Sequence, residues 1–377
     1  MESSWGTPYN RYMRKFAGLG LALGSLAFSL FLAEAICKLA FNRPLTGPLF
    51  QHDPILVHRN YPNLDTSQVF DGRRTSIYTD AMGHRRPGFR LDPPKRDSIH
   101  VLWLGDSFTF GTGVAAEEGF VQLLENSARN LDPDIRFANA AVGGYETQHE
   151  VGYYEAYAQN EKADLVVLVI GPNDVQGNYP LFVYEINNGD LRFPSHRANP
   201  NTNVWLKNFA NSFPLYGFLS SHSYFFSVLR YAIAASYVRK PPGLENDKPV
   251  AAQATLAPPP KTEEPSNRMT KLLIRRLATL AKERGASLLV TNCGSQIAYG
   301  TTLPFLKDAP AWFKQEGIDY IDVSDQINDP GSSEPLTFVS DGHYNVYGNQ
   351  RFAHAFWPHL ERRLLALRRP ETVAQIR

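Results

Sequence analysis

The chain has 377 residues, with 38 lysines and arginines against 37 aspartates and glutamates, and only two cysteines. Its near-zero net charge and the lack of a basic stripe argue against a nucleic-acid-binding protein, and two cysteines exclude a disulfide framework. The length fits one sizeable catalytic domain with attachments, which acts on a neutral or small-molecule partner.

The first predicted element is an apolar segment near the N-terminus. A largely apolar run from Phe16 to Cys37 follows the basic residues Arg11, Arg14 and Lys15. The run is long enough to cross a bilayer core of about 30 Å, and its basic flank predicts a cytoplasmic N-terminus. We therefore expect residues 1–41 to form a cytoplasmic stub and an uncleaved anchor. This would make the chain a single-pass membrane protein in which the residues after the anchor lie outside the cytoplasm.

The alternative reading of this segment is a cleaved signal peptide. Against it, no small-x-small site closes the apolar run, and the run is long for the apolar region of a signal peptide. Residues 42–97 follow, with many prolines, glycines and charges and little periodicity. They are expected to form a tether and an irregular lead-in.

From residue 98 the pattern changes to one of alternating strands and helices, which defines a domain over residues 98–377. The expected strands are Ile99–Leu104, Ile135–Ala138, Leu165–Ile170, Ser287–Thr291 and Ile318–Val323, and the expected helices are Glu117–Asn130, Thr147–Lys162, Met269–Arg284 and Tyr347–Leu367. This alternation predicts an α/β class, a three-layer α/β/α sandwich with a mainly parallel sheet. In such sheets the site lies beyond the carboxyl ends of the strands.

A large insertion at about residues 178–267 interrupts the alternation. Its first part is rich in aromatic residues, and its middle, Phe213 to Tyr237, is an apolar helix that carries serines, His222 and Arg230. These polar residues favour a helix on the core or on the bilayer surface over a second membrane span. Its last part, residues 240–267, has the proline-rich and charged composition of a disordered loop.

Two sequence blocks at strand ends carry serine and glycine residues suited to catalysis. Ser107, in Gly105-Asp106-Ser107, directly follows a strand, so its hydroxyl and its backbone N–H can face the crevice. A serine hydroxyl is a poor nucleophile until a base removes its proton. Gly143 and Gly144 follow the next strand, where a backbone N–H can approach a reacting carbonyl oxygen. A turn with a helix cap explains the first block equally well, and a tight strand-to-helix turn explains the second.

Two further blocks carry an amide and an acid-base pair. Asn173 follows the apolar strand Leu165–Ile170, where its carboxamide can donate to an oxyanion, although Asn-Asp is also a generic turn dipeptide. Asp341 stands two residues before His343, and such an acid can fix the tautomer of the imidazole and stabilise its charged form. A metal pair is the alternative for these two residues, but other ligands at helpful spacing are missing.

The four blocks in this order, each at a strand end, resemble the SGNH hydrolases, the GDSL-like lipase/esterase family. The lead-in from Ile77 to Arg85 also looks like the segment before Gly-Asp-Ser in bacterial membrane-anchored members. The resemblance covers roughly residues 99–178 and 271–367, and it implies the flavodoxin-like SGNH fold.

The resemblance implies a role for each block residue. Ser107 would be the nucleophile and His343 its base, and the N–H groups of Ser107 and Gly144 with the side chain of Asn173 would form the oxyanion hole. Many members place the acid three residues before the histidine, but a branch of the family uses Asp-x-His, so Asp341 is the expected acid. If Asp341 cannot reach the ring, a dyad with a backbone carbonyl takes its place.

The predicted reaction is acyl transfer from an ester through a covalent acyl-serine, with water as acceptor, on a small-molecule or carbohydrate ester. An O-acyltransferase that modifies a cell-envelope polysaccharide, and a non-catalytic anchored binding protein on a hydrolase scaffold, are the alternatives. No cofactor, metal or nucleic acid is implied. His149, close after Gly144, is a rival base within a predicted helix. Asp106 and Asp174 are expected to hold loops by side-chain-to-backbone bonds.

Overall fold

The computed structural model describes most of the chain. The described residues are 8–41, 45–89, 98–171, 173–179, 183–187, 190–193, 213–238, 265–293, 304–327, 331–339 and 342–368. The part of the insertion that was expected to be disordered, residues 240–267, lies outside these ranges except for its last three residues. Asp341 also lies outside them.

The main sheet of the described residues has nine strands in the order β1-β4-β5-β6-β8-β7-β9-β12-β13. Its parallel half consists of β8 (Arg136–Asn139), β7 (His100–Leu104), β9 (Leu165–Ile170), β12 (Ser287–Asn292) and β13 (Asp319–Ile321). The chain passes from β7 to β8 on one side and then to β9 on the other. The connections therefore reverse direction at β7, and ligands of α/β sheets bind beyond the strand ends at such a reversal.

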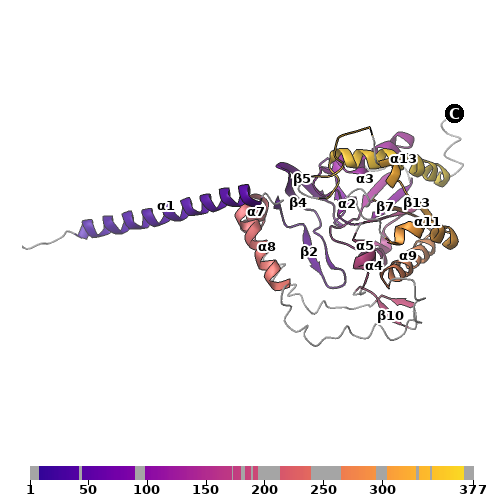
Figure 1. Ribbon diagram of the computed structural model, residues 1–377, viewed down its shortest axis with the longest axis horizontal. Coiled ribbons are helices and arrows are strands. Elements are labelled where there is room, and N and C mark those ends of the chain that lie inside the picture. Colours follow the sequence, from indigo (N-terminus) through magenta and orange to yellow (C-terminus); the bar gives the residue numbers. More distant parts are fainter. Residues whose placement is uncertain are drawn as a thin grey trace, which may run out of the picture.

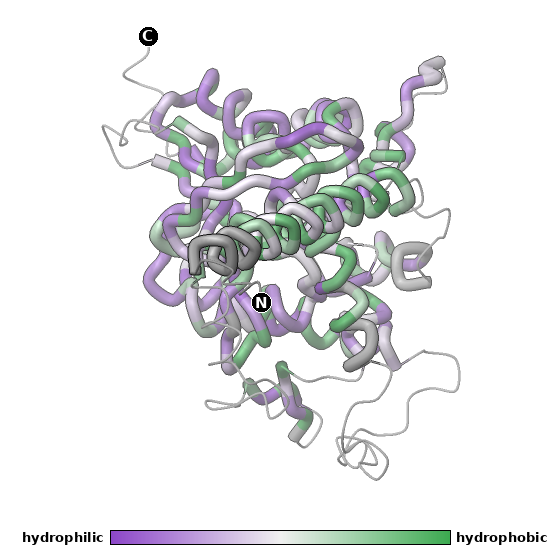
Figure 2. Tube along the Cα trace, turned by 90° about the vertical axis from the view of Figure 1, so that its left-hand side faces the viewer, coloured by the Kyte–Doolittle hydropathy of each residue, from purple (hydrophilic) through white to green (hydrophobic). Residues whose placement is uncertain are grey.

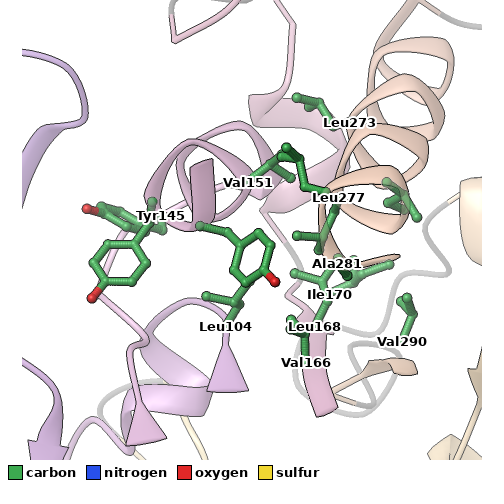
Figure 3. Packing of buried hydrophobic residues seen from close by; sticks show 14 of the residues in the cluster. Leu104, Tyr145, Val151, Val166, Leu168, Ile170, Leu273, Leu277, Ala281 and Val290 are labelled. Carbon is green, nitrogen blue, oxygen red and sulfur yellow. The ribbon is translucent and has the colours of Figure 1, made fainter. Parts of the chain in front are cut away.

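Helices cover both faces of the sheet, which confirms the expected α/β fold with its three layers (Figure 1). One face packs against α3 (Phe120–Leu131) and α13 (Val346–Leu367), and the other against α4 (Thr147–Ala156), α9 (Pro265–Glu283) and α11 (Pro304–Glu316). Every residue of β9 is buried. Figure 3 shows one of these layers, with Leu273 and Leu277 of α9 beside Leu168 and Ile170 of β9.

The segment expected to be an irregular tether instead extends the sheet, so that expectation was wrong for residues 45–86. In it, β6 (Arg85–Arg86) pairs antiparallel with β8 and continues the sheet through β5 (Arg73–Thr79), β4 (Asp65–Phe70) and β1 (Leu45–Thr46). A separate hairpin, β2 (Phe50–Asp53) with β3 (Val57–Asn60), lies beside them. These strands are rich in polar residues, β1 and β6 are only two residues long, and the partner of β6 in the parallel half is distant in the sequence. They therefore lack the apolar runs from which a strand is predicted.

The expected helix between Phe213 and Tyr237 is two helices, α7 (Pro214–His222) and α8 (Tyr224–Val238). They separate at Ser223, whose backbone is extended and whose hydroxyl donates to a carboxylate oxygen of Glu34, 2.7 Å away. The contact with Glu34, which lies outside the insertion, coincides with the end of α7 and the start of α8. The expected helix from Thr147 to Lys162 likewise ends early, with α4 followed by a 3₁₀ turn, Ala158–Asn160.

The N-terminal helix α1 (Pro8–Phe41) extends away from the rest of the molecule (Figure 1). Between Phe16 and Phe41 it is long and apolar enough to cross a membrane, and an apolar window of 18 residues within this stretch is not buried by the protein. In Figure 2, which looks onto the side from which α1 extends, this helix is green along most of its length. A signal sequence shares these properties, so the helix is either a membrane span or such a sequence.

Candidate active site

Ser107 is held at the carboxyl end of the central strand β7. It is the first residue of the short helix α2 (Ser107–Phe110), and the side chain of Asp106 caps this helix by accepting a bond from the Phe108 N–H at 2.8 Å. The preceding Gly105 passes so close to Thr109 that a Cβ there would collide with its side chain. The first N–H groups of a helix have no partner within it, so the Ser107 N–H is open to an outside acceptor.

His343 lies at Ser107 although 236 residues separate them, with its Nε2 at 2.6 Å from the Ser107 Oγ. The histidine is carried by a short antiparallel turn in which its carbonyl accepts from the Phe338 N–H at 3.0 Å. The neighbouring Tyr344 is buried and donates its hydroxyl to the Cys293 carbonyl. The ring of Phe108 lies 5.0 Å from the imidazole. These contacts fix a hydroxyl and a base within hydrogen-bond reach, as proton abstraction requires.

The turn at Gly143 and Gly144 passes beside Ser107. A Cβ placed on Gly143 would lie 3.9 Å from the Ser107 Cβ, and Gly144 has a φ of 78°, which favours glycine. Gly144 is exposed. The structure thus brings three of the four sequence blocks together around one hydroxyl.

Asn173, from the third block, joins the same turn through its side chain. Its Nδ2 donates to the Tyr145 carbonyl at 2.7 Å, and the residue is exposed. A carboxamide nitrogen carries two hydrogens, so one remains for another acceptor. Asn173 therefore links the glycine turn to the end of β9, and its second amide hydrogen can still donate to another acceptor.

The sequence interpretation missed two residues of the hairpin β2–β3 that lie at this turn. The His58 Nε2 is 2.9 Å from the Gly143 carbonyl oxygen, and a Cβ on Gly143 would lie 3.2 Å from the Phe50 ring. The Tyr145 hydroxyl in turn donates to the His58 carbonyl at 2.6 Å. His58 and Gly143 are 85 residues apart, and no local motif surrounds His58 that could have signalled this contact.

The rival base His149 occupies a different environment. It is buried in α4, stacks on the Tyr145 ring at 4.9 Å, and its Nδ1 accepts from the Glu146 N–H at 3.2 Å. Burial, together with the charge of His58, lowers the pKa of His149 to about 3. A histidine that stays neutral and serves as a helix-cap acceptor fits a structural role, while the contact to the Ser107 Oγ belongs to His343.

A group of buried carboxyl groups lies behind the site. Asp106 and Asp174 hold loops as expected, Asp174 by accepting from the Gly171 N–H at 2.7 Å. Burial raises the pKa of Asp106 to about 6, and burial with the charges of Glu150 and Asp106 raises the pKa of Asp174 well above its usual range. Neither carboxyl oxygen of Glu150 has a hydrogen-bond partner among the described residues. Burial raises the pKa of Glu150 as well, and the nearby charges of Asp106 and Glu146 add to this effect.

Glu150→Gln is therefore expected to stabilise the protein increasingly as the pH rises. The folded chain keeps the Glu150 proton above 4.5, its ordinary pKa, whereas the unfolded chain releases it there. The stability contributed by this group is thus fully present below that pH and declines as the pH rises toward the folded-state pKa. Thermal melts of the wild type and Glu150→Gln should differ little at about pH 5 and clearly at about pH 8. An equal difference at both pH values would contradict the assignment.

Comparison with known proteins identifies a family that this chain matches. A family model described as the GDSL-like lipase/acylhydrolase family matches residues 103–351, well over half of the chain. An uncharacterized curated protein of Mycoplasma pneumoniae is 32% identical over 126 residues, which make up 31% of this chain and only 14% of that protein.

Solved structures show low similarity to this chain. The structure of TesA is 16% identical, with 69% of this chain and 97% of that chain covered and a TM-score of 0.38. The psychrotrophic esterase EstA from Pseudoalteromonas sp. is 12% identical, with 70% and 98% covered and a TM-score of 0.39.

Proposed function

Because the chain belongs to the GDSL-like lipase/acylhydrolase family, whose members hydrolyse acyl esters, we propose that it is a serine esterase or deacylase that works through a covalent acyl-serine. The observation that carries this proposal is the 2.6 Å contact between the His343 Nε2 and the Ser107 Oγ. A hydroxyl is activated by a base at this distance, and the contact lies where the sheet connections reverse.

The proposed reaction has two balanced halves. The Ser107 Oγ attacks the ester carbonyl while His343 takes the hydroxyl proton, and the same proton then passes to the leaving alkoxide. Water attacks the acyl-serine in the second half, His343 takes its proton and returns it to Ser107, and the free acid leaves. We assign Asp341 as the acid that orients His343 with Nδ1 protonated, so that Nε2 accepts the proton of the Ser107 hydroxyl.

The oxyanion of each tetrahedral intermediate would be held by three donors. These are the N–H of Ser107, which starts α2, the N–H of Gly144 in its left-handed turn, and the second amide hydrogen of Asn173. Donors fixed before the reaction cost little reorganisation when charge develops, so they stabilise the transition state more than the substrate.

Two alternatives use the same scaffold: an O-acyltransferase acting on a cell-envelope polysaccharide, and an anchored binding protein without activity. Labelling of the full chain with a fluorophosphonate probe tests for an activated serine. Ester hydrolysis over a series of acyl chain lengths, with and without a polysaccharide acceptor, then identifies the product. Free acid in the absence of acceptor supports the esterase, acyl transfer only with acceptor supports the transferase, and neither labelling nor turnover supports the binding protein.

We also propose that α1 is an uncleaved anchor and that the hydrolase domain, to which residues 45–86 contribute strands of the main sheet, lies on the extracytoplasmic side of a bacterial inner membrane. A contact of Glu34 supports retention of the helix, because its carboxylate accepts from the N–H groups of Tyr224 and Phe225 at 2.6 and 3.1 Å. Cleavage of α1 as a signal sequence would remove this cap from α8, and a lost cap destabilises a helix by about 1 kcal/mol.

A reporter fused after Arg377 is expected to be active only outside the cytoplasm, because the basic residues before the apolar run hold the N-terminus inside. The purified chain should also retain its N-terminal residues when sequenced. A fusion that is active only in the cytoplasm would refute the proposed side, and a mature chain that starts after Phe41 would refute the anchor.

A further inference from the structure

The helices α7 and α8 of the insertion bury small polar residues and expose large apolar ones. Ser220, Ser221 and Ser227 are buried. The exposed residues, by contrast, are Phe213, Leu215, Phe218, Phe225, Leu229 and Ile233, and Leu215 and Phe218 keep 66% and 58% of their surface accessible. Burial of apolar surface is the main favourable term in water, so a helix pair with this arrangement is not built to face water.

The polar side of α7 packs against the rest of the protein. The helix packs on β1 and β4, and the Ser221 carbonyl accepts from a guanidinium nitrogen of Arg74 at 3.0 Å. The exposed apolar residues of each helix recur at helical spacing, as Leu215 and Phe218 in α7 and Phe225, Leu229 and Ile233 in α8. They therefore form one exposed face of each helix.

The start of α8 is fixed by residues close to the C-terminal end of α1. Glu34 of α1 caps α8, and the Lys38 ammonium lies 5.9 Å from the centre of the Tyr224 ring. Charged and tyrosine side chains at the end of a spanning helix lie at the interface between lipid and water. In Figure 1, α8 runs across the direction of α1 instead of along it, on the side of the body from which α1 leaves.

From this arrangement we propose that α7 and α8 seat the hydrolase domain on the lipid bilayer in which α1 is anchored. Their apolar face would lie at the boundary of headgroups and acyl chains, to a depth of about 5–10 Å, as amphipathic interfacial helices do. The continuity of this face with the anchor helix favours lipid over a second protein as its partner. The inference rests on the proposed anchoring by α1, but not on the esterase activity.

The experiment measures how close single positions lie to lipid. The full chain, carrying Leu215→Cys, Phe218→Cys or Leu229→Cys, is labelled with an environment-sensitive fluorophore and reconstituted into vesicles that contain nitroxide lipids. The two native cysteines are buried, and an unsubstituted chain gives their background. Strong quenching at all three positions and a blue-shifted emission are expected.

Two further variants serve as references. Leu365→Cys is a matched control, because Leu365 is also an exposed leucine (47%) but lies in α13, on the opposite side of the molecule from α1. Gly24→Cys reports on the anchor itself, and a Cβ there meets no other atom within 4 Å. Quenching should be several-fold stronger at the α7 and α8 positions than at Leu365.

Each other outcome overturns the proposal in a recognisable way. Quenching at Gly24 without quenching at α7 and α8 leaves the anchor in place and rejects the lipid seat. Protection of α7 and α8 from an aqueous quencher without quenching by lipid means that a protein covers them, which also rejects it. Lack of quenching at Gly24 rejects both the seat and the anchor, while fluorophosphonate labelling reports separately on the esterase.

A second, independent observation concerns His58, and it rests on the proposed esterase. The carbonyl of Gly143 and the N–H of Gly144 belong to one planar trans peptide, so they point in opposite directions. The His58 ring holds this carbonyl at 2.9 Å, and since a carbonyl only accepts, the Nε2 must donate. We infer that His58 is a positioning residue, which aims the Gly144 N–H at the oxyanion from behind the peptide.

Kinetics of His58→Ala and His58→Gln test this role in a wild-type background whose ester turnover has been established. His58→Ala should lower kcat by about tenfold or more, less than the about 10²–10³ for removal of a donor, with little change in KM. His58→Gln, whose amide can donate to the same carbonyl, should recover part of kcat. His354→Ala, at an exposed histidine of α13, should match the wild type.

Two results would overturn the inference. One is wild-type kcat in a folded His58→Ala variant. The other is equal loss in His58→Ala and His58→Gln together with equal loss of melting temperature, since that pattern shows a role in folding alone.

Discussion

Ser107→Ala is expected to abolish labelling by a fluorophosphonate and to lower ester turnover by about 10⁶, the loss that follows removal of a triad nucleophile. The reason is geometric. The Ser107 Oγ is the atom held at 2.6 Å from the His343 Nε2, and we propose that the three oxyanion donors act on the carbonyl oxygen of the ester that this hydroxyl attacks. Without this hydroxyl the covalent intermediate cannot form, and only binding and the oxyanion donors remain to accelerate hydrolysis.

Ser76→Ala is a suitable control for this variant, because Ser76 is exposed on β5, away from the strand end that carries Ser107. It should label and turn over as the wild type does. Thermal melts should show that both variants are folded, because the Ser107 side chain contributes no helix cap, a role that belongs to Asp106. Labelling of Ser107→Ala at the wild-type rate would refute the assignment of the nucleophile.

Asn173→Ala is expected to lower kcat by about 10²–10³ with little change in KM, because its second amide hydrogen would meet the oxygen only when that oxygen carries charge. Asn173→Asp should be at least as damaging. A carboxylate donates no hydrogen bond, and it would face both the developing oxyanion and the Tyr145 carbonyl that Asn173 now contacts at 2.7 Å.

The contact with Tyr145 also defines the competing explanation. If Asn173 only ties the glycine turn to β9, both variants should lose melting temperature, and kcat and KM should worsen together as the turn loosens. If the amide acts on the oxyanion, Asn173→Ala should lose kcat selectively at nearly unchanged melting temperature. Asn126→Ala, at an exposed asparagine of α3, controls for the loss of an amide as such. Near wild-type turnover in Asn173→Asp would rule out the oxyanion role.

The sequence by itself determined the class of the fold and indicated the sheet edge at which we propose the chemistry. Strand β9 was predicted at its observed bounds because helices cover both of its faces, and a strand buried on both faces needs an uninterrupted apolar run. Ser107, Gly144 and Asn173 could be placed near one another because the carboxyl ends of parallel strands share one edge of the sheet. The family match supports that interpretation over residues 103–351.

Only the tertiary structure decided the contacts that join distant or weakly patterned segments. His58 reaches Gly143 across 85 residues, and Glu34 reaches Tyr224 across 190. The two-residue strand β6 is too short to show any periodicity. Hydrophobic periodicity reports which faces of a segment are buried, but not which partner buries them. Strands at the antiparallel side of the sheet and the break between α7 and α8 depend on that partner. For this reason the sequence alone predicts a tether for the lead-in and a single helix for α7 and α8.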